Sequence, residues 1–308
     1  MTAWGVLLPT FDPLRTGAGF PVADAARLAE AAGFDSVWAG DHLACPAPVL
    51  DATICLGAAA AVTQRVRLGF SVMLLGLRQS AWAAKQIATL QHLCSGRLVL
   101  GVGVGGEFPQ EYAAAGVPLE RRGARLDEAL ERLPGLLAGA GEHRLEPPAP
   151  MPPLLVGGRS DRALVRAARF ADAWLPMWIS PQTLSKRRER LAELAAAHGR
   201  PVPKLSLLVL AHVGDEARSA REQARAHLHG QYGMELEQVE RWTAVGTADA
   251  VAAFLGPYTR AGVEEILLLP MGAAPLEQIA RLAAVTHTFR SSGGPAAEAS
   301  SAASGGTK

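Results

Sequence analysis

The sequence has few cysteines and no excess of charge of either sign. Its three cysteines, Cys45, Cys55 and Cys94, are an odd number without a C-x-x-C spacing, which argues against a disulfide framework and a structural zinc site. The 30 Lys and Arg balance 29 Asp and Glu, and the net charge is +1. Charge therefore gives no reason to expect a nucleic acid or an anionic membrane as partner. We expect reduced thiols in a cytoplasmic protein that acts on a small molecule.

A leader segment and long apolar runs are also missing. The N-terminus, MTAWGVLLPTFDP, has no basic segment followed by an apolar run of signal-peptide length. The longest apolar stretches, such as residues 54–62, are far shorter than the roughly 20 residues that span a bilayer. We therefore expect neither export nor membrane insertion. Residues 291–308 contain no aromatic and no large aliphatic side chain, so they cannot offset the entropy of ordering and are predicted to form a disordered tail.

Short apolar segments alternate with longer segments of helical period. The eight expected strands cover residues 4–9, 36–40, 66–74, 97–103, 153–158, 172–177, 204–213 and 264–270. Strands that are apolar throughout and separated by helices require a parallel sheet covered by helices. Eight such units are the number that closes a barrel. Residues 1–290 are therefore predicted to form one domain, a (β/α)8 TIM barrel.

Reactive groups in such a barrel lie at the carboxyl ends of the strands. Asp41 and His42 follow the second expected strand, in GDHL. A histidine there can give or take a proton near neutral pH, and a neighbouring carboxylate can raise its basicity or fix its tautomer. The alternative is a histidine that only hydrogen-bonds a loop.

The fourth expected strand ends in a glycine-rich segment, GVGVGGEF, that at first suggests a dinucleotide-binding loop. Such a loop belongs to the first βα unit and lies directly before a helix. Here the segment belongs to the fourth strand, and Pro109 interrupts it before a helix can form. We interpret Gly103 and its neighbours as leaving room for a flat ring, with Glu107 presenting its carboxyl group to that space. The alternative for Glu107 is a partner for the N-terminus of a helix around residues 110–115.

Two glycines and two polar residues follow the fifth expected strand, just before a helix. They are Gly157, Gly158, Arg159 and Ser160. Free backbone N–H groups at a helix start, a hydroxyl and a guanidinium together form an anion site, and phosphate is the usual guest. The alternative is that Ser160 only caps the helix.

Aromatic and sulfur-containing side chains follow the sixth expected strand. Met177 and Trp178 are candidates for the wall of a substrate pocket, although packing between sheet and helices is the commoner fate of such residues. The sequence has no H-x-x-x-H pair on a helix beside a carboxylate and no G-x-S-x-G after a strand. We therefore expect neither a metal site nor a nucleophile elbow.

The chain resembles the bacterial luciferase-like oxidoreductases over nearly all of residues 3–290. The segments similar to successive signatures of that family are SVWAGDHL, RVRLGFSVMLL, AKQIATLQHLCSGRLVLGVGVGGEFPQEYAAAGVP, RRGARLDEAL, PPLLVGGRSDRALVRAARFADAWLP and VGTADAVAAFLGPYTRAGVEEILL, in the expected order. The resemblance implies a (β/α)8 barrel that binds FMN or the deazaflavin coenzyme F-420 at the carboxyl ends of its strands.

The resemblance also implies roles for individual residues. The cofactor-binding set is Asp41, Ser71, Val72, Gly103, Gly157, Gly158, Arg159 and Ser160. Within it, a bulge at Ser71 and Val72 would support the central ring, and Gly158 to Ser160 would hold the phosphate. His42, together with Glu107, would lie beside the reacting carbon as proton donor or acceptor.

The same resemblance favours one of the two cofactors. GDHL and the Ser71-Val72 segment are more similar to the deazaflavin-dependent dehydrogenases and reductases, which move a hydride between the ring and a substrate. We therefore predict an F-420-dependent oxidoreductase acting on a small organic substrate. One alternative is an FMNH2-dependent monooxygenase that uses O2 and reduced flavin from a separate reductase. Another is a barrel that binds flavin without catalysis.

Two departures from the family pattern narrow the substrate. Ala44 stands where deazaflavin-dependent sugar-phosphate dehydrogenases carry tryptophan, which argues against that substrate class. The frequent RHP after the third strand reads Arg78-Gln79-Ser80 here, so a histidine available for proton transfer is missing. The resemblance implies a homodimer, but no interface is evident in the sequence.

Overall fold

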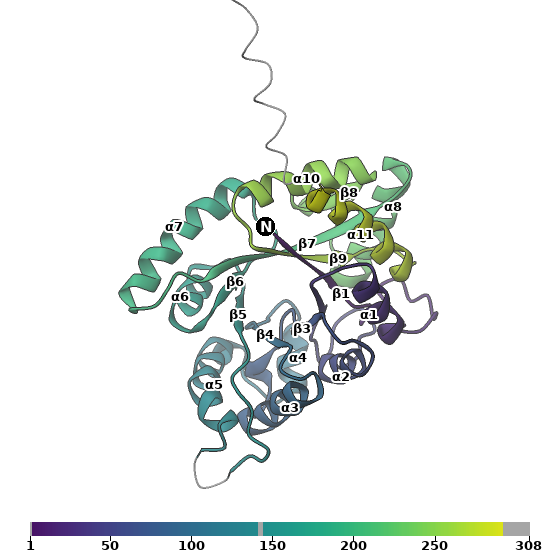
Figure 1. Cartoon of the computed structure of the whole chain (residues 1–308). Helices are drawn as coiled ribbons and strands as arrows, with labels where there is room; N and C mark the ends of the chain where they lie inside the picture. The colour runs from purple at the N-terminus through teal and green to yellow at the C-terminus, as the bar shows by residue number, and fades with distance from the viewer. Residues whose placement is uncertain (1, 141–143, 292–308) are drawn as a thin grey trace, which may run out of the picture.

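A parallel β-sheet forms the centre of the molecule, and helices surround it (Figure 1). The computed structural model describes residues 2–140 and 144–291. The strands are β1 Ala3–Leu7, β2 Ser36–Ala39, β3 Arg67–Phe70, β4 Leu98–Val102, β5 Leu154–Gly157, β6 Ala173–Leu175, β7 Lys204–Val213, β8 Ala244–Gly246 and β9 Glu265–Pro270.

Eight of these strands close into a barrel. Their order is β6-β5-β4-β3-β2-β1-β9-β7, and a further pairing of β6 with β7 closes the ring. Each pairing is parallel. The (β/α)8 barrel predicted from the alternation of strands and helices is confirmed, and each of the eight expected segments contains a strand.

The short strand β8 is an addition to the eight expected strands. It pairs with residues 211–213 at the carboxyl end of β7, whereas β6 pairs with residues 204–205 at the other end of the same strand. It therefore extends the sheet outside the ring. Three residues give too short an apolar run to indicate a strand.

Helices connect the strands and cover the outside of the ring (Figure 1). They are α1 Val22–Ala31, α2 Ala52–Val62, α3 Ser80–Leu93, α4 Pro109–Ala114, α5 Arg122–Leu137, α6 Asp161–Phe170, α7 Pro181–Ala197, α8 Ala217–Tyr232, α9 Leu236–Val239, α10 Ala248–Arg260 and α11 Pro275–Ser291. Side-chain oxygens of Ser160, Ser180 and Thr247 accept backbone N–H groups at the starts of α6, α7 and α10, as helix N-caps do.

The interior of the barrel is filled around one tryptophan. Trp38 is fully buried, and a Cβ atom added to Gly69 would lie 2.2 Å from its ring. Its Nε1–H donates to Ser36 Oγ (2.7 Å), and Ser36 Oγ–H donates to Glu265 Oε1 (2.6 Å). These polar groups begin strands, so they hold the end of the barrel opposite the expected site, where such groups serve stability.

The described part of the chain ends at Ser291, in α11. The rest of the tail that is predicted to be disordered lies outside the described residues. Within the described residues, no helix is both long enough and apolar enough to cross a membrane.

Candidate active site

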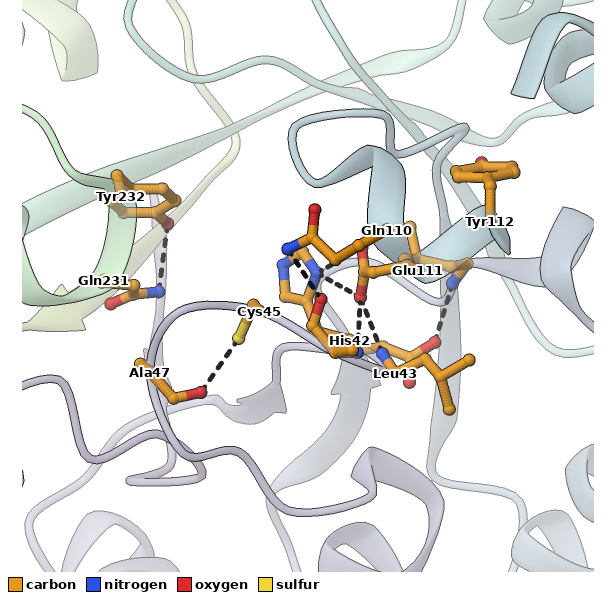
Figure 2. Close-up of polar contacts among 12 residues, drawn as sticks. His42, Leu43, Cys45, Ala47, Gln110, Glu111, Tyr112, Gln231 and Tyr232 are labelled. Carbon is orange, nitrogen blue, oxygen red and sulfur yellow. Dashed lines mark hydrogen bonds and ion pairs between the residues drawn. The ribbon is translucent and has the colours of Figure 1, made fainter. Parts of the chain in front are cut away.

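An imidazole and a carboxylate meet at the carboxyl ends of the strands. His42 lies in the segment after β2, and Glu111 lies on α4, which follows β4. His42 Nδ1 lies 3.0 Å from both carboxylate oxygens of Glu111 (Figure 2). The side chain of Glu111 is 0% exposed and that of His42 is 16% exposed. The carboxylate is therefore shielded from water, whereas the His42 ring is partly exposed at the carboxyl ends of the strands, the region called the cleft below.

The same carboxylate also fixes the loop that carries His42. Glu111 Oε1 accepts the backbone N–H groups of Leu43 (2.7 Å) and Ala44 (3.1 Å). With a carboxylate as partner, Nδ1 of His42 carries the hydrogen and donates it. Nε2 is then free to accept a proton when the ring is neutral and to donate one when it is charged. The sequence prediction missed Glu111, although it falls on the helix expected near residues 110–115.

Two aromatic rings hold the imidazole edge-on. The ring centroid of His42 lies 5.1 Å from that of Phe108 and 5.8 Å from that of Phe11. A Cβ atom at Gly40 would lie 2.6 Å from the Phe11 ring, so glycine is needed there. The orientation of His42 is thus fixed by packing as well as by hydrogen bonding, as a proton-transfer group requires.

The glycine-rich segment after β4 makes room for protein atoms. A Cβ atom at Gly103 would lie 2.4 Å from Val72, and one at Gly105 would lie 3.0 Å from Leu74. Glu107 is exposed, and the carboxylate that contacts His42 is Glu111. The prediction that Pro109 interrupts this segment before a helix can form is wrong. Pro109 is the first residue of α4, a position where its missing N–H would have no partner in any case.

Asp41 binds protein groups. It is buried, its Oδ1 and Oδ2 accept hydrogen bonds from the Arg78 guanidinium (2.8 and 2.7 Å), and Oδ2 also accepts the backbone N–H of Leu74 (2.8 Å). Such a bidentate pair is geometrically specific. This ion pair ties the segment after β2 to the segment after β3. Asp41, its carboxylate, directly precedes His42 in the sequence.

The peptide bond between Ser71 and Val72 is cis. Strand β3 stops at Phe70, earlier than expected, and pairing with β4 resumes at a bridge between Met73 and Val102. Ser71 Oγ is buried without a hydrogen-bond partner among the described residues. An unpaired buried hydroxyl is costly, so it marks a place where a ligand atom would be stabilised.

The segment Gly158 to Ser160, predicted to hold an anion, lies directly before α6. Gly158 has a φ of +115°, and its carbonyl accepts the Nε1–H of the buried Trp174 (2.7 Å). Ser160 Oγ accepts the N–H of Ala163 (3.2 Å) as the cap of α6, so its own hydrogen remains available. Arg159 lies over the Trp178 ring, with its guanidinium carbon 5.8 Å from the centroid.

A hollow of about 410 Å³ borders Gly157, Gly158 and Ser160. Arg122 and Arg162 line it, and neither forms an ion pair with a described carboxylate. Glu120, Asp127 and Arg166 line it as well, but Asp127 is neutralised by Arg166 at 2.6 Å. The neighbouring Arg121 forms a surface ion pair with Glu128 (3.0 Å), whereas Arg122 lines the hollow.

A second pair of aromatic rings, those of Trp178 and Tyr232, lies beside the segment after β6. Trp178 has a φ of +52°, and its Nε1 is buried without a partner among the described residues. Its ring contacts that of Tyr232, on α8, edge-on with centroids 5.6 Å apart. Met177 pairs with Leu208 by a parallel bridge and packs with the residues that fill the barrel interior. Tyr232 was not identified from the sequence.

One thiol, that of Cys45, lies in the same segment as His42. Burial raises the pKa of Cys45 to about 11, and the nearby Glu111 carboxylate adds to the effect, so the thiol is not a ready nucleophile. In the part of the chain that the structure describes, no group of three or more His, Cys, Asp or Glu side chains is arranged to hold a metal ion.

Comparison with known proteins identifies the family. Residues 4–265 match the model of the luciferase-like monooxygenases. The chain belongs to the luciferase-like monooxygenase family. Among its relatives, the uncharacterized protein Rv0940c of Mycobacterium tuberculosis is 31% identical over 266 residues, which cover 76% of this chain and 85% of that protein. The phthiodiolone/phenolphthiodiolone dimycocerosates ketoreductase of Mycobacterium bovis is 31% identical over 219 residues, 58% of this chain and 57% of the ketoreductase.

Solved structures of luciferase-like proteins share the fold. The monooxygenase RslO1 from Streptomyces bottropensis superposes with a TM-score of 0.77 at 23% identity, over 94% of this chain and 100% of that chain. An F420-dependent secondary alcohol dehydrogenase, in complex with an F420-acetone adduct, superposes with a TM-score of 0.77 at 20% identity, over 92% and 98%. A monooxygenase and an F420-dependent dehydrogenase are thus both among the structural neighbours.

Proposed function

We propose that this protein is a deazaflavin-dependent oxidoreductase that transfers a hydride to or from a small organic substrate, with His42 handling the accompanying proton. The observation that carries the proposal is the His42–Glu111 pair at 3.0 Å, at the carboxyl ends of the barrel strands. Membership of an oxidoreductase family supports an enzyme. The secondary alcohol dehydrogenase among the structural neighbours and the ketoreductase among the relatives favour a ketone or a secondary alcohol as substrate.

The residues of the cleft fit a ring system that carries a phosphate. Ser71 Oγ and Trp178 Nε1 are buried polar atoms in need of partners. Gly158, Ser160, Arg122 and Arg162 surround a hollow with backbone, hydroxyl and guanidinium groups suited to an anion. We propose that the groups around this hollow hold the phosphate and that Ser71 and Val72 support the ring. When bound, the deazaflavin would supply or accept the hydride.

His42 then has a defined task. A ketone that gains a hydride at its carbonyl carbon needs a proton at its oxygen, and Nε2 of the charged ring would donate it. In the reverse direction, Nε2 of the neutral ring would accept the proton of an alcohol. Glu111 keeps Nδ1–H occupied in both states, so proton exchange is confined to Nε2. Positioned acid–base groups of this kind contribute about 100- to 10,000-fold in rate.

The second candidate function is an FMNH2-dependent monooxygenase supplied with reduced flavin by a separate reductase. The structural neighbour RslO1 is a monooxygenase, and another neighbour is a type II Baeyer-Villiger monooxygenase in complex with FMN. A non-catalytic flavin-binding barrel is the third. That function would give no reason for a shielded Glu111 carboxylate that orients the His42 ring.

Cofactor titration separates these functions. The purified protein is titrated separately with coenzyme F-420 and FMN, and turnover of ketones and secondary alcohols is measured with and without oxygen. We expect tighter binding of F-420 and product without oxygen. Tighter binding of FMN together with product only under oxygen would favour the monooxygenase, and binding without turnover of any tested substrate would favour the non-catalytic barrel.

We also propose that the chain forms a homodimer through α2 and α3. Ile54 on α2 and Trp82 on α3 are 76% and 71% exposed, although both are apolar. The two helices pack side by side (Figure 1). Exposed apolar side chains on adjacent elements are typical of protein interfaces.

A further inference from the structure

A chain of hydrogen bonds runs from Gly272, just after β9, to Tyr232 at the end of α8. The backbone N–H of Gly272 lies 3.2 Å from Nδ1 of His227, and Nε2 of His227 lies 2.9 Å from Oε1 of Gln231. Nε2 of Gln231 lies 3.2 Å from the hydroxyl oxygen of Tyr232, as Figure 2 shows. His227 and Gln231 are buried. None of these residues takes part in the proton transfer proposed for His42.

The direction of every bond in this chain is fixed by its first member. A backbone N–H can only donate, so Nδ1 of His227 accepts and Nε2 carries the hydrogen of the neutral ring. The Gln231 amide must therefore turn its oxygen to His227 and its NH2 group to Tyr232. Burial lowers the pKa of His227 to about 4, which keeps the ring neutral near pH 7.

The Tyr232 hydroxyl thus accepts a hydrogen bond and keeps its own hydrogen. Among the described residues, no oxygen or nitrogen accepts that hydrogen. The hydroxyl lies at the same end of the barrel as His42, because the Tyr232 ring packs edge-on against Trp178 in the segment that follows β6. Burial raises the pKa of the Tyr232 phenol, and the nearby Glu107 carboxylate adds to the effect. The hydroxyl therefore stays protonated and able to donate.

We propose that Tyr232 is a substrate-binding residue whose hydroxyl donates a hydrogen bond to an oxygen acceptor of the substrate, a carbonyl or hydroxyl oxygen. The inference rests on the proposed function, since it assigns a residue to the same cleft. The amide of Gln231 polarises the hydroxyl, because a group that accepts a hydrogen bond becomes a better donor. The Tyr232 group selects for oxygen-bearing substrates and leaves cofactor binding to other residues.

The first test compares Tyr232→Phe with the wild-type enzyme in steady-state turnover. The variant removes one oxygen and keeps the ring that contacts Trp178. We expect KM for the ketone to rise about 3- to 10-fold, the effect of losing one neutral hydrogen bond, and the Kd of the cofactor to stay unchanged. The control is Tyr258→Phe, which removes the buried hydrogen bond from Tyr258 to the Ile179 carbonyl (2.7 Å). It should lower the melting temperature and leave KM unchanged.

The second test does not depend on turnover. The chain has three tyrosines, so a protein labelled with ¹³Cζ-tyrosine gives three resonances, and Tyr232→Phe identifies one of them. Cyclohexanone is titrated into the full chain with and without added cofactor. We expect it to shift the Tyr232 resonance and to bind more weakly to the variant.

The outcomes separate the two proposals. An unchanged KM in Tyr232→Phe, or a Tyr232 resonance that cyclohexanone leaves unmoved both with and without cofactor, would overturn the role of Tyr232. A Tyr232 resonance that shifts in a protein without hydride transfer would instead count against the proposed function alone.

Discussion

Nδ1 of His42 and the carboxylate of Glu111 lie 3.0 Å apart although 69 residues separate them in the sequence. One belongs to the segment after β2 and the other to the helix after β4. The barrel brings both to one end, and the buried carboxylate holds the loop of His42 through two backbone N–H groups as well. This arrangement gives the cleft one oriented imidazole.

The first prediction concerns the two carboxylates of the glycine-rich segment. Glu111→Gln removes the charged acceptor that fixes Nδ1–H of His42, so we expect kcat to fall by about 10-fold or more. Glu107→Gln alters an exposed side chain and should lower kcat less. Both are compared by steady-state kinetics, with Glu128→Gln at the surface pair with Arg121 as the control. A larger loss in Glu107→Gln would transfer the central role to that residue.

The second prediction concerns the hollow beside Gly158. Arg122→Met and Arg162→Met each remove a cation that has no carboxylate partner among the described residues. Loss of one charge-assisted hydrogen bond to a phosphate should raise the Kd of the cofactor about 10- to 100-fold. Fluorescence titration at two salt concentrations measures it, with Arg169→Met, from the surface pair with Glu131, as the control. Equal affinity in all the variants would place the phosphate elsewhere.

The third prediction concerns stability at acid pH. The pKa of His227 is lowered by burial from 6.5 to about 4, so between these values the unfolded chain binds the proton and the folded chain does not. Stability therefore falls as the pH falls through this window. The titration of His227 alone should lower the free energy of unfolding by about 3 kcal/mol between pH 7 and pH 4. In the folded state a charged ring at His227 would also face the positive end of the Gly272 N–H.

Urea unfolding between pH 7 and pH 4 measures this dependence. His227→Gln is expected to be less stable at pH 7 and to lose less stability on acidification. His229→Gln, on the same helix but exposed, should keep the wild-type pH dependence. The same slope in all three proteins would show that His227 titrates normally.

The fourth prediction concerns assembly. Trp82→Arg and Ile54→Arg place a charge on the exposed apolar surface of α2 and α3, and buried charges without partners are costly. We expect a dimer for the wild-type protein and a monomer for either variant by light scattering. Val202→Arg, at an exposed valine just before β7, should leave the dimer intact. A wild-type monomer would contradict the proposal directly.

The sequence was sufficient for the barrel because each strand is a separate apolar run between helices. It was insufficient for β8, whose three residues pair only through the position of β7. The interruption of the third strand at Ser71 and Val72 was expected only from the family resemblance. Hydrophobic periodicity carries no signal for the isomer of a peptide bond.

The side chains of the cleft were harder to predict than the fold. Proximity in sequence drew attention to Glu107, next to the glycines, but the helix that starts at Pro109 turns Glu111 to His42. Arg122 and Arg162 reach the hollow from two different helices. Contacts of this kind depend on the packing of elements far apart in the chain, and one sequence does not contain their geometry.

Hydride transfer under anaerobic conditions tests the central claim most directly. The protein is mixed with reduced F-420 and a panel of ketones, and oxidation of the cofactor is followed by absorbance for the wild type and for His42→Gln. We expect oxidation in the wild type without oxygen, and a rate at least about 100-fold lower in His42→Gln at unchanged cofactor affinity. Full turnover by His42→Gln, or product only with FMNH2 and oxygen, would contradict the account.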